Sequence, residues 1–374
     1  MRIEDSAQSP NPRQMESLDT VGAIGEMPPS SATIKDLGPA SDTPTQLNQS
    51  ELDRRAMIQD EEPSLSPFRL SMRRLRRNKR AMISLGIVLF MIIGSFVFPP
   101  IYLHLGPTIS GGPAGLDKVS PSQYHNYTNQ QLLYIDSPGS AAYPLGADGL
   151  GRDILARLMA GINVSIEVAF LVAIFDVGLG LLVGTLAGFF GGWMDTFLAR
   201  FTDIMFAFPG LLFAILAAAT LGAAFSDKFG PPGRLILVSL AIGITIWPQM
   251  ARYVRGYTLQ LKEQQFVEAA RTVGTANHSI ILRHIVPNLF SIVVAAVTLD
   301  IVGVIIGEAT ISLLGLGVQP PGSSLGLMIY DGSRKITSAP TEVLWPTLTL
   351  AILVIAFAFL GDGINDAFNP RSKD

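Results

Sequence analysis

Three acidic residues, Asp176, Asp300 and Glu308, lie inside long apolar stretches of this sequence. A charge within a membrane-spanning helix costs about 2.5–3.5 kcal/mol at the centre, so such residues indicate a transport pathway or a partner contact. Asp300 and Glu308 are eight residues apart and share roughly one helix face, which we expect to look into a water-filled cavity. For Glu308, helix packing or gating is the alternative. Asp176 either biases a path toward cations or bonds to a neighbouring helix, and packing is the interpretation we favour.

The sequence lacks the residue patterns of a catalytic or metal site. It contains no G-x-x-x-x-G-K-[ST] loop, in which backbone amides and a lysine hold phosphates, so this chain is not expected to bind nucleotide. It has no H-E-x-x-H or comparable ligand spacing, no cysteine, and four scattered histidines. We therefore predict no catalytic residue, no metal and no cofactor bound by this chain.

The apolar stretches themselves indicate an integral membrane protein. Of 374 residues, 48% are hydrophobic and 15% are charged, whereas about a quarter of a soluble domain is charged. The apolar runs cover 81–98, 164–190, 204–222, 235–251, 289–316 and 344–361. Each is close to the ~20 residues that cross a hydrocarbon core as a helix. The sequence thus predicts an all-α fold with six transmembrane helices.

Glycines recur every fourth residue in the second run, at Gly180, Gly184 and Gly188. A row of small residues at this spacing lets a second helix approach closely. We predict that these glycines serve helix packing and have no chemical role.

The residues before the first run differ sharply in composition from the rest. Residues 1–64 hold 12 acidic and 5 basic residues and lack apolar periodicity. Such a segment cannot bury enough surface to offset its ordering entropy, so we predict a disordered cytoplasmic tail over 1–66. A basic cluster over 69–80 follows. It resembles a nucleic-acid patch, but next to a spanning helix it indicates cytoplasmic retention, and no nucleic-acid partner is expected.

The distribution of Lys and Arg predicts that both termini are cytoplasmic. With six spans, the cytoplasmic segments 73–80, 191–200 and 252–288 and the C-terminus hold 14 Lys and Arg, and the external segments hold 7. The expected divisions after the tail are a basic segment with the first helix over 67–103, an extracytoplasmic loop over 104–163, the other spans over 164–363, and a cytoplasmic C-terminus over 364–374.

Two details of the external side follow from this layout. Pro99 and Pro100 are expected to close the first helix. The hydrophobic pattern from Leu145 to Ile162 suggests a short interfacial helix, and His104 and His125 are expected to be solvated.

The cytoplasmic segment between the fourth and fifth spans, residues 252–288, is too polar to cross a membrane and too regular for a linker. Phe266, Val267, Ala270 and Val273 recur at helical spacing. Gly274 interrupts this stripe where a positive φ or a close backbone approach is easily adopted, and a second stripe follows that stops at Pro287. We predict a helical hairpin over 264–287. It either lies on the membrane or docks another protein, and composition leaves both open.

The hairpin resembles the EAA motif in permeases of bacterial ATP-binding cassette (ABC) importers. The resemblance rests on Glu268-Ala269-Ala270, then Gly274, then Pro287. His284 stands at one of the motif's usual apolar positions, which is similar to the dipeptide and oligopeptide branch of that family. The resemblance implies that these six residues form a coupling helix that sits in a cleft of an ATPase subunit.

Further stretches extend the resemblance over about residues 68–372. They are Pro144 to Asp148, Gly151-Arg152-Asp153 with Arg157, Gly191 to Asp195, Asp203 to Gly210, Glu308 to Pro321, and Gly361 to Pro370. Together they resemble the C-type, or second-permease, subunit of the dipeptide/oligopeptide/nickel family. Asn163 departs from the pattern, since arginine is common there. Gly151, Arg152, Asp153 and Arg157 are taken as the family signature on the outer side.

The resemblance implies a prokaryotic cell-membrane protein that forms a path for di- or oligopeptides together with a homologous permease. Two ATPase subunits, carrying ATP and Mg, and an extracytoplasmic solute-binding protein are the other implied partners. Three alternatives stay open. They are an importer of the same family for nickel or another small solute, an ion-coupled secondary transporter that uses Asp176, Asp300 and Glu308, and a membrane scaffold without transport.

Overall fold

The computed structural model describes residues 67–111, 117–230 and 232–368. The tail predicted over 1–66 and the last residues of the predicted C-terminal segment lie outside these ranges. The elements on the N-terminal side are α2 (Pro67–Arg77), α3 (Lys79–Tyr102), β1 (Ile109–Gly111), β2 (Asp117–Val119), α4 (Pro121–Tyr124), the 3₁₀ turn η1 (Leu132–Tyr134), α5 (Ile154–Phe190) and α6 (Gly192–Phe206). The rest are α7 (Gly210–Phe229), α8 (Gly233–Leu261), α9 (Gln265–Thr272), α10 (Asn277–Ile280), the π-helical turn η2 (Ile281–Ile285), α11 (Val286–Leu313), α12 (Leu325–Ser333) and α13 (Thr341–Phe368).

Six helices in the described ranges are long and apolar enough to span a membrane, as predicted. They are α3, α5, α7, α8, α13 and a continuous helix over Asn277–Leu313. The third span begins at Gly210 and not near 204, because the start of that apolar run belongs to the separate helix α6. Pro209 precedes Gly210 in an extended conformation and separates the two helices.

The first span does not end at its two prolines, contrary to expectation. Helix α3 continues through Pro99 and Pro100 to Tyr102. Pro99 has no N–H to donate to the carbonyl of Ser95, and the side-chain amide of Asn163 in α5 donates to that carbonyl instead, at 2.8 Å. A partner from another helix therefore permits the proline at this position.

Helix α5 starts at Ile154 and runs unbroken to Phe190, so residues 154–162 open the second span and do not form a separate interfacial helix. The carboxylate of Asp153 caps it by accepting from the backbone N–H groups of Leu155 and Ala156 at 2.9 and 3.4 Å. No proline follows within α5, and nothing else interrupts the helix.

The segment between α3 and α5 contains the described strands. Strands β1 and β2 pair antiparallel, with Ile109 opposite Val119. Val119, Tyr124, Ala142 and Tyr143 form a small apolar core beside them. The prediction of an all-α fold therefore holds for the spans but missed this two-stranded ribbon, because three-residue strands are too short for a period-2 pattern.

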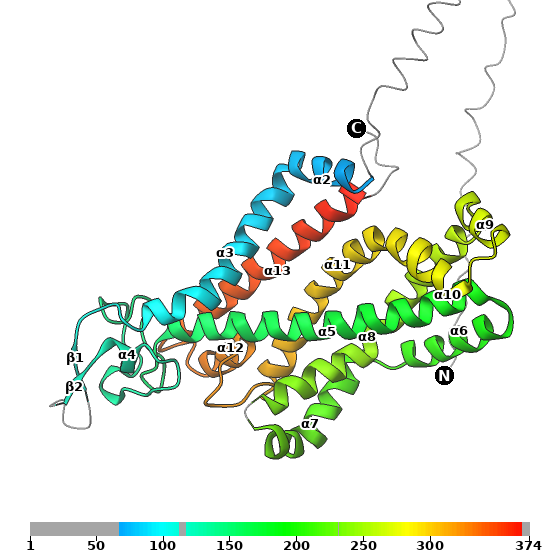
Figure 1. Cartoon of the computed structure of the whole chain (residues 1–374). Coiled ribbons are helices and arrows are strands. Elements are labelled where there is room, and N and C mark those ends of the chain that lie inside the picture. Colours follow the sequence, from blue (N-terminus) through cyan, green and yellow to red (C-terminus); the bar gives the residue numbers. More distant parts are fainter. Residues whose placement is uncertain (1–66, 112–116, 231, 369–374) are drawn as a thin grey trace, which may run out of the picture. The chain divides into compact units, whose positions relative to one another are not determined.

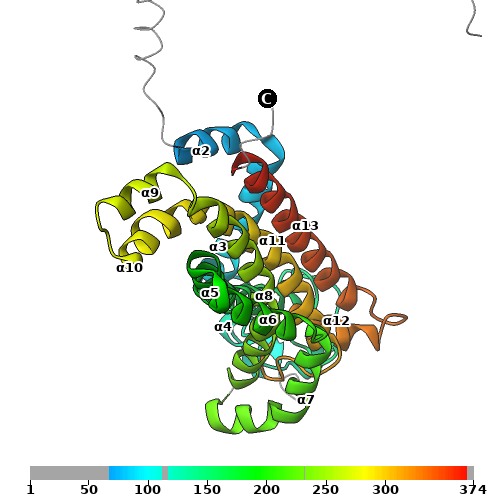
Figure 2. The same ribbon diagram turned by 90° about the vertical axis from the view of Figure 1, so that its right-hand side faces the viewer.

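Helix α8 is the most enclosed of the spans. Its apolar stretch is 56% buried, whereas those of the other five are 17–33% buried. It packs against α5, α7, α11 and α6, while α13 packs against α3, α11 and α12 (Figures 1 and 2). Large apolar side chains such as Phe90, Phe170 and Leu212 remain exposed, as expected where lipid is the solvent.

The glycine row of α5 lies directly against α8, which confirms the predicted packing role. A Cβ on Gly184 would lie 2.5 Å from the carbonyl oxygen of Ala251 and 2.7 Å from Cβ of Val254. A Cβ on Gly188 would lie 2.7 Å from Cβ of Thr258. All three distances are shorter than real Cβ contacts, so the two backbones approach this closely only because the side chains are absent.

Replacing Gly184 by alanine is expected to destabilise the fold by about 1–3 kcal/mol, because the added methyl overpacks the contact with α8. The matched control is Gly178→Ala in the same helix, where no atom lies within 4 Å of the added Cβ. There the loss of glycine's backbone freedom makes the change neutral or stabilising, by up to about 1 kcal/mol. Thermal unfolding of the purified proteins in detergent compares the two, and equal melting temperatures would contradict the packing role.

Candidate functional site

A short helical hairpin connects α8 to α11 (Figure 1). Its first helix, α9, ends in a left-handed turn at Gly274, whose φ is 81°. The N–H of Gly274 donates to the carbonyl of Arg271 at 2.9 Å, and that of Thr275 donates to Ala270 at 3.0 Å. This is a Schellman ending, which favours glycine. The position therefore favours glycine for its positive φ and not for a close backbone approach, because no atom lies within 4 Å of the position that a Cβ would take.

The second arm of the hairpin does not stop at Pro287, as the sequence had suggested. It passes through η2 into α11 as one helix. Proline lacks an N–H, and its ring crowds the carbonyl four residues earlier, which is that of Arg283. A π-helical turn, in which the N–H of Val286 donates to the carbonyl of Ile281, precedes the proline and accommodates it. His284 and Pro287 thus lie within a continuous helix that leads into the fifth span.

The hairpin has a buried face and an exposed face. Val267, Ile280 and Ile285 are fully buried, and Ala270 is half-buried. The apolar stripe predicted for α9 is only partly right, because Phe266 is 40% exposed and Val273 is 85% exposed. Phe266 lies about 100° around the helix from Val267, and Val273 follows the last helical residue. Glu268 and Ala269 are exposed on the side away from the buried face.

The buried face packs on three spans at once. Val267, Ile280 and Ile285 form one apolar cluster with Phe189 of α5, Met250 and Val254 of α8, and Leu289 and Val293 of α11.

Two cations near the hairpin add contacts with the end of α5. The guanidinium of Arg271 lies over the ring of Phe189 at 5.2 Å, and the ammonium of Lys262 donates to the carbonyl of Gly188 at 3.0 Å. The hairpin is therefore attached to the spans by packing and a cation–π contact, and a hydrogen bond from Lys262 just before it caps the end of α5.

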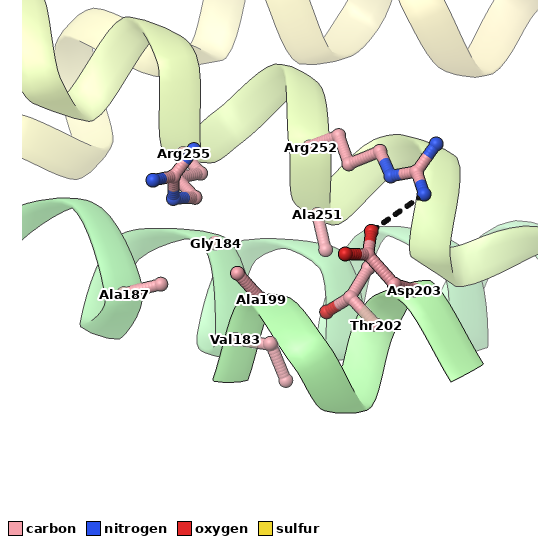
Figure 3. Close-up of a pocket in the computed structure, with 9 residues that line it drawn as sticks. All are labelled: Val183, Gly184, Ala187, Ala199, Thr202, Asp203, Ala251, Arg252 and Arg255. Carbon is pink, nitrogen blue, oxygen red and sulfur yellow. Dashed lines mark hydrogen bonds and ion pairs between the residues drawn. The ribbon is translucent and has the colours of Figure 1, made fainter. Parts of the chain in front are cut away.

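Helix α6 is held to α8 beside this cluster by two Arg–Asp pairs. Arg255 Nε and Nη2 donate to the two oxygens of Asp195 at 2.5 and 2.7 Å, and Arg252 donates to Asp203 at 2.7 Å (Figure 3). The hydrogen bond from Arg255 lowers the pKa of the Asp195 carboxyl below its usual value. A cavity of about 330 Å³ lies between α5, α6 and α8 at this point, with Gly184, Thr202 and Arg252 among its lining residues.

The three acids of the apolar runs all lie at the interface between α5 and α11, but only two of them come together. Asp176 of α5 and Asp300 of α11 line one small cavity there. Glu308 is 2% exposed and accepts hydrogen bonds from Ser165 and Ser312 at 3.2 and 2.7 Å. Asp300 and Glu308 do share a face of α11, and in this chain that face packs on α5.

The arginines of the outer signature form a buried ion network. Asp148 accepts from Arg152 Nε at 2.8 Å and from Arg157. Both arginines also reach Asp331 of α12, at 3.5 and 3.2 Å. Asp148, Arg152 and Arg157 are at most 5% exposed, so the network joins the loop, α5 and α12 through paired charges.

The other two signature residues shape the turn before α5. Gly151 has a φ of 72° and donates to the carbonyl of Asp148 at 2.7 Å. Asp153 is fully buried and, besides capping α5, accepts from the hydroxyl of Tyr102 at 2.8 Å.

His125 lies in the same region, and its expected solvation is wrong. The side chain is buried, with Nδ1 2.5 Å from Asp153 and Nε2 2.9 Å from the carbonyl oxygen of Leu105. Its ring lies against that of Tyr102, tilted by 35°, with ring centroids 3.8 Å apart. His104, by contrast, is exposed.

Sequence reasoning did not identify several of these partners. In the sequence, Arg252 and Arg255 contribute only to the Lys and Arg distribution that predicts orientation. The acids between the second and third apolar runs, Asp195 and Asp203, are a signal that could have predicted their ion pairs. Asp331 lies 174 residues from Arg157, and no local pattern connects them. No group of three or more His, Asp or Glu residues that could hold a metal ion occurs within the ranges described.

Replacing Arg157 by methionine is expected to destabilise the protein by about 3–5 kcal/mol, because it leaves buried Asp148 with one cation fewer. The comparison at the same end of the molecule is Lys335→Met. Its partner is Asp136 at 2.6 Å, and both side chains are about one-third exposed, so the loss should stay below about 1 kcal/mol. Melting temperatures in detergent measure both changes. A loss for Arg157→Met no larger than that for Lys335→Met would contradict the proposed importance of burial.

Two family models match this chain. Residues 180–374 match the model described as binding-protein-dependent transport system inner membrane component, and residues 66–132 match the N-terminal transmembrane domain of oligopeptide transport permease C.

Individual relatives agree with these models. The oligopeptide transport system permease protein of Bacillus subtilis is 35% identical over 83% of this chain and 92% of its own length. The dipeptide transport system permease protein of Lactococcus lactis is 31% identical over 83% and 93%, and the glutathione transport system permease protein of Pectobacterium atrosepticum is 36% identical over 68% and 81%. A chain of the MetNI methionine ABC transporter, solved in inward facing conformations, matches with a TM-score of 0.46 at 20% identity, over 58% of this chain and 98% of that chain. The protein described here thus belongs to the family of binding-protein-dependent transport system inner membrane components.

Proposed function

We propose that this protein is the permease subunit of an ATP-driven importer and forms, with a homologous permease, the translocation path for di- and oligopeptides. Relatives that align over most of this chain are named for transport of dipeptides, oligopeptides and glutathione, all of which are peptides. The observation that carries the mechanism is the hairpin, which is anchored on one face and exposed on the other.

The exposed face is proposed to dock an ATPase subunit. Glu268, Ala269 and Gly274 are exposed, and apolar Val273 beside them is 85% exposed. A partner shifts an equilibrium only by binding one state better than the other. Because Val267 and Ile285 are buried against three spans, displacement of the hairpin by an ATPase would displace those spans. His284 and Pro287 carry the second arm into α11 and would transmit the same movement.

The other subunits follow from the same proposal. The chain has no phosphate-binding loop, so ATP and Mg are assigned to two partner ATPase subunits. The loop after α3 and helix α12 are assigned to the outer side, where a solute-binding protein would deliver substrate. The buried network of Arg152 and Arg157, together with Gly151 and Asp153, would give that docking surface a stiff base.

The proposed orientation places the hairpin and both termini in the cytoplasm of a prokaryote. It is supported by the excess of Lys and Arg on that side, and the named relatives are bacterial. Asp176, Asp300 and Glu308 lie between α5 and α11 rather than on an open surface. Their burial favours a role in a gate, where two helices separate, over a role as lining of the path.

The test of this function is reconstitution with the sister permease, the ATPases and the binding protein in lipid vesicles. Uptake of a labelled peptide is expected to require both ATP and the binding protein. Uptake driven by a proton gradient without ATP would overturn the proposal in favour of a secondary transporter. Preference for a nickel complex over peptides would change the assigned substrate and leave ATP-driven import standing. Absence of any flux would indicate a membrane scaffold without transport.

Glu268→Gln and Gly274→Ala test the coupling role in the same vesicles. The first substitution removes an exposed charge. The second places a residue with a Cβ in a left-handed conformation, which costs about 1–2 kcal/mol. Peptide uptake per ATP hydrolysed is expected to fall roughly 5- to 150-fold, the range of ordinary coupling energies, with membrane insertion unchanged. Glu263→Gln, an exposed acid just before α9, serves as the control and should keep the wild-type ratio. Wild-type uptake in both test variants would refute the assignment.

A further inference from the structure

The cavity between α5 and α11 brings two carboxyl groups together in apolar surroundings. Asp176 is 1% exposed, and Asp300 is half-buried. The two side chains line a space too small to admit a water molecule, and the other residues around it are Ala169, Val172, Ala173, Ile246, Val297, Ile301 and Val304. None of these lining residues, from α5, α8 or α11, carries a charge or titrates.

Asp176 has no hydrogen-bond donor in the described part of the chain. Neither of its oxygens has a partner, and Oδ2 of Asp300 has none either. The polar group that Asp176 faces is the other carboxyl, which accepts hydrogen bonds when ionised and cannot donate. Glu308, eight residues along α11, differs because the hydroxyls of Ser165 and Ser312 donate to it.

Two ionised carboxylates cannot stay together in such a place. Like charges repel strongly where the dielectric is low, and a neighbouring carboxyl pair relieves the repulsion by keeping one proton. The proton turns one carboxyl into an O–H donor and leaves the other as its acceptor, so both carboxyls gain a hydrogen bond. A metal cation would need oxygen ligands in greater number and more room than this cavity offers.

We propose that Asp176 and Asp300 form a proton-binding site, in which a single shared proton joins α5 to α11. The bound proton is part of the helix contact. Separation of α11 from α5 would expose both carboxyls to water and release the proton. Because α11 is continuous with the second arm of the hairpin, a movement of that hairpin would reach this site. Proton binding at this site does not depend on which substrate the protein transports.

Infrared spectroscopy of the purified full-length protein at pH 7 tests for the proton. A protonated carboxyl has a C=O stretching band that is distinct from carboxylate bands and shifts in D2O. The wild-type protein is expected to show this band, and Asp176→Asn and Asp300→Asn are each expected to reduce its intensity by the share of one carboxyl. An asparagine amide can donate directly to the remaining carboxylate, so no proton is needed in either variant. Asp227→Asn, at an exposed position on α7, is the matched control and should retain the band.

Two outcomes would overturn the proposal. One is a wild-type spectrum in which neither Asp176→Asn nor Asp300→Asn removes intensity, which would mean that both groups are ionised. The other is a band that disappears when Na⁺ or K⁺ is added at constant ionic strength, which would mean that a metal cation occupies the site. If one variant fails to fold, the other still decides whether the two carboxyls share a proton. The salt comparison needs only the wild-type protein.

Discussion

The close approach of α5 to α8 is the contact on which the rest of the structure depends. Three glycines spaced four apart give α5 no side chains at these positions on the face toward α8. Residues of α8 such as Val254 and Thr258 therefore pack directly against the backbone of α5. The same contact brings the end of α5, at Phe189, beside the place where the hairpin leaves α8. With any larger residue in that row, the cluster that holds the hairpin would lose its alignment, because packed interiors transmit displacements.

The two ends of the spans are stabilised by different physical means. At the loop end, Asp148, Arg152 and Arg157 are buried, and separating them would leave unpaired charges away from water. At the hairpin end, the pair of Arg252 and Asp203 is about half exposed, and such pairs contribute little. The loop end is therefore held by buried paired charges, while the hairpin end is held by apolar packing and by partly exposed Arg–Asp pairs. Helix α5, unbroken over 37 residues, reaches from one end to the other.

The features that sequence predicted well depend on local rules. Six apolar runs became six helices, and Gly274, for which a positive φ or a close backbone approach was expected, has a positive φ. The predictions that were wrong concern residues whose behaviour depends on a hydrogen-bond partner far away in the sequence. Pro99 does not end α3, because Asn163 takes up the carbonyl that the proline leaves free. His125 is not solvated, because the carboxylate of Asp153 and the carbonyl oxygen of Leu105 lie within hydrogen-bond distance of its two ring nitrogens.

The sequence by itself determined that this chain crosses a membrane, and it identified the hairpin and the glycine row, because hydrophobic length and residue spacing act over a few turns of helix. Only the tertiary structure decided which acids meet. The sequence grouped Asp300 with Glu308 by their spacing on one helix, whereas the fold pairs Asp300 with Asp176 across two helices and gives Glu308 to two serines. The physical reason is that burial and hydrogen-bond partners come from packing between segments far apart in the chain, and no periodicity along one segment records them.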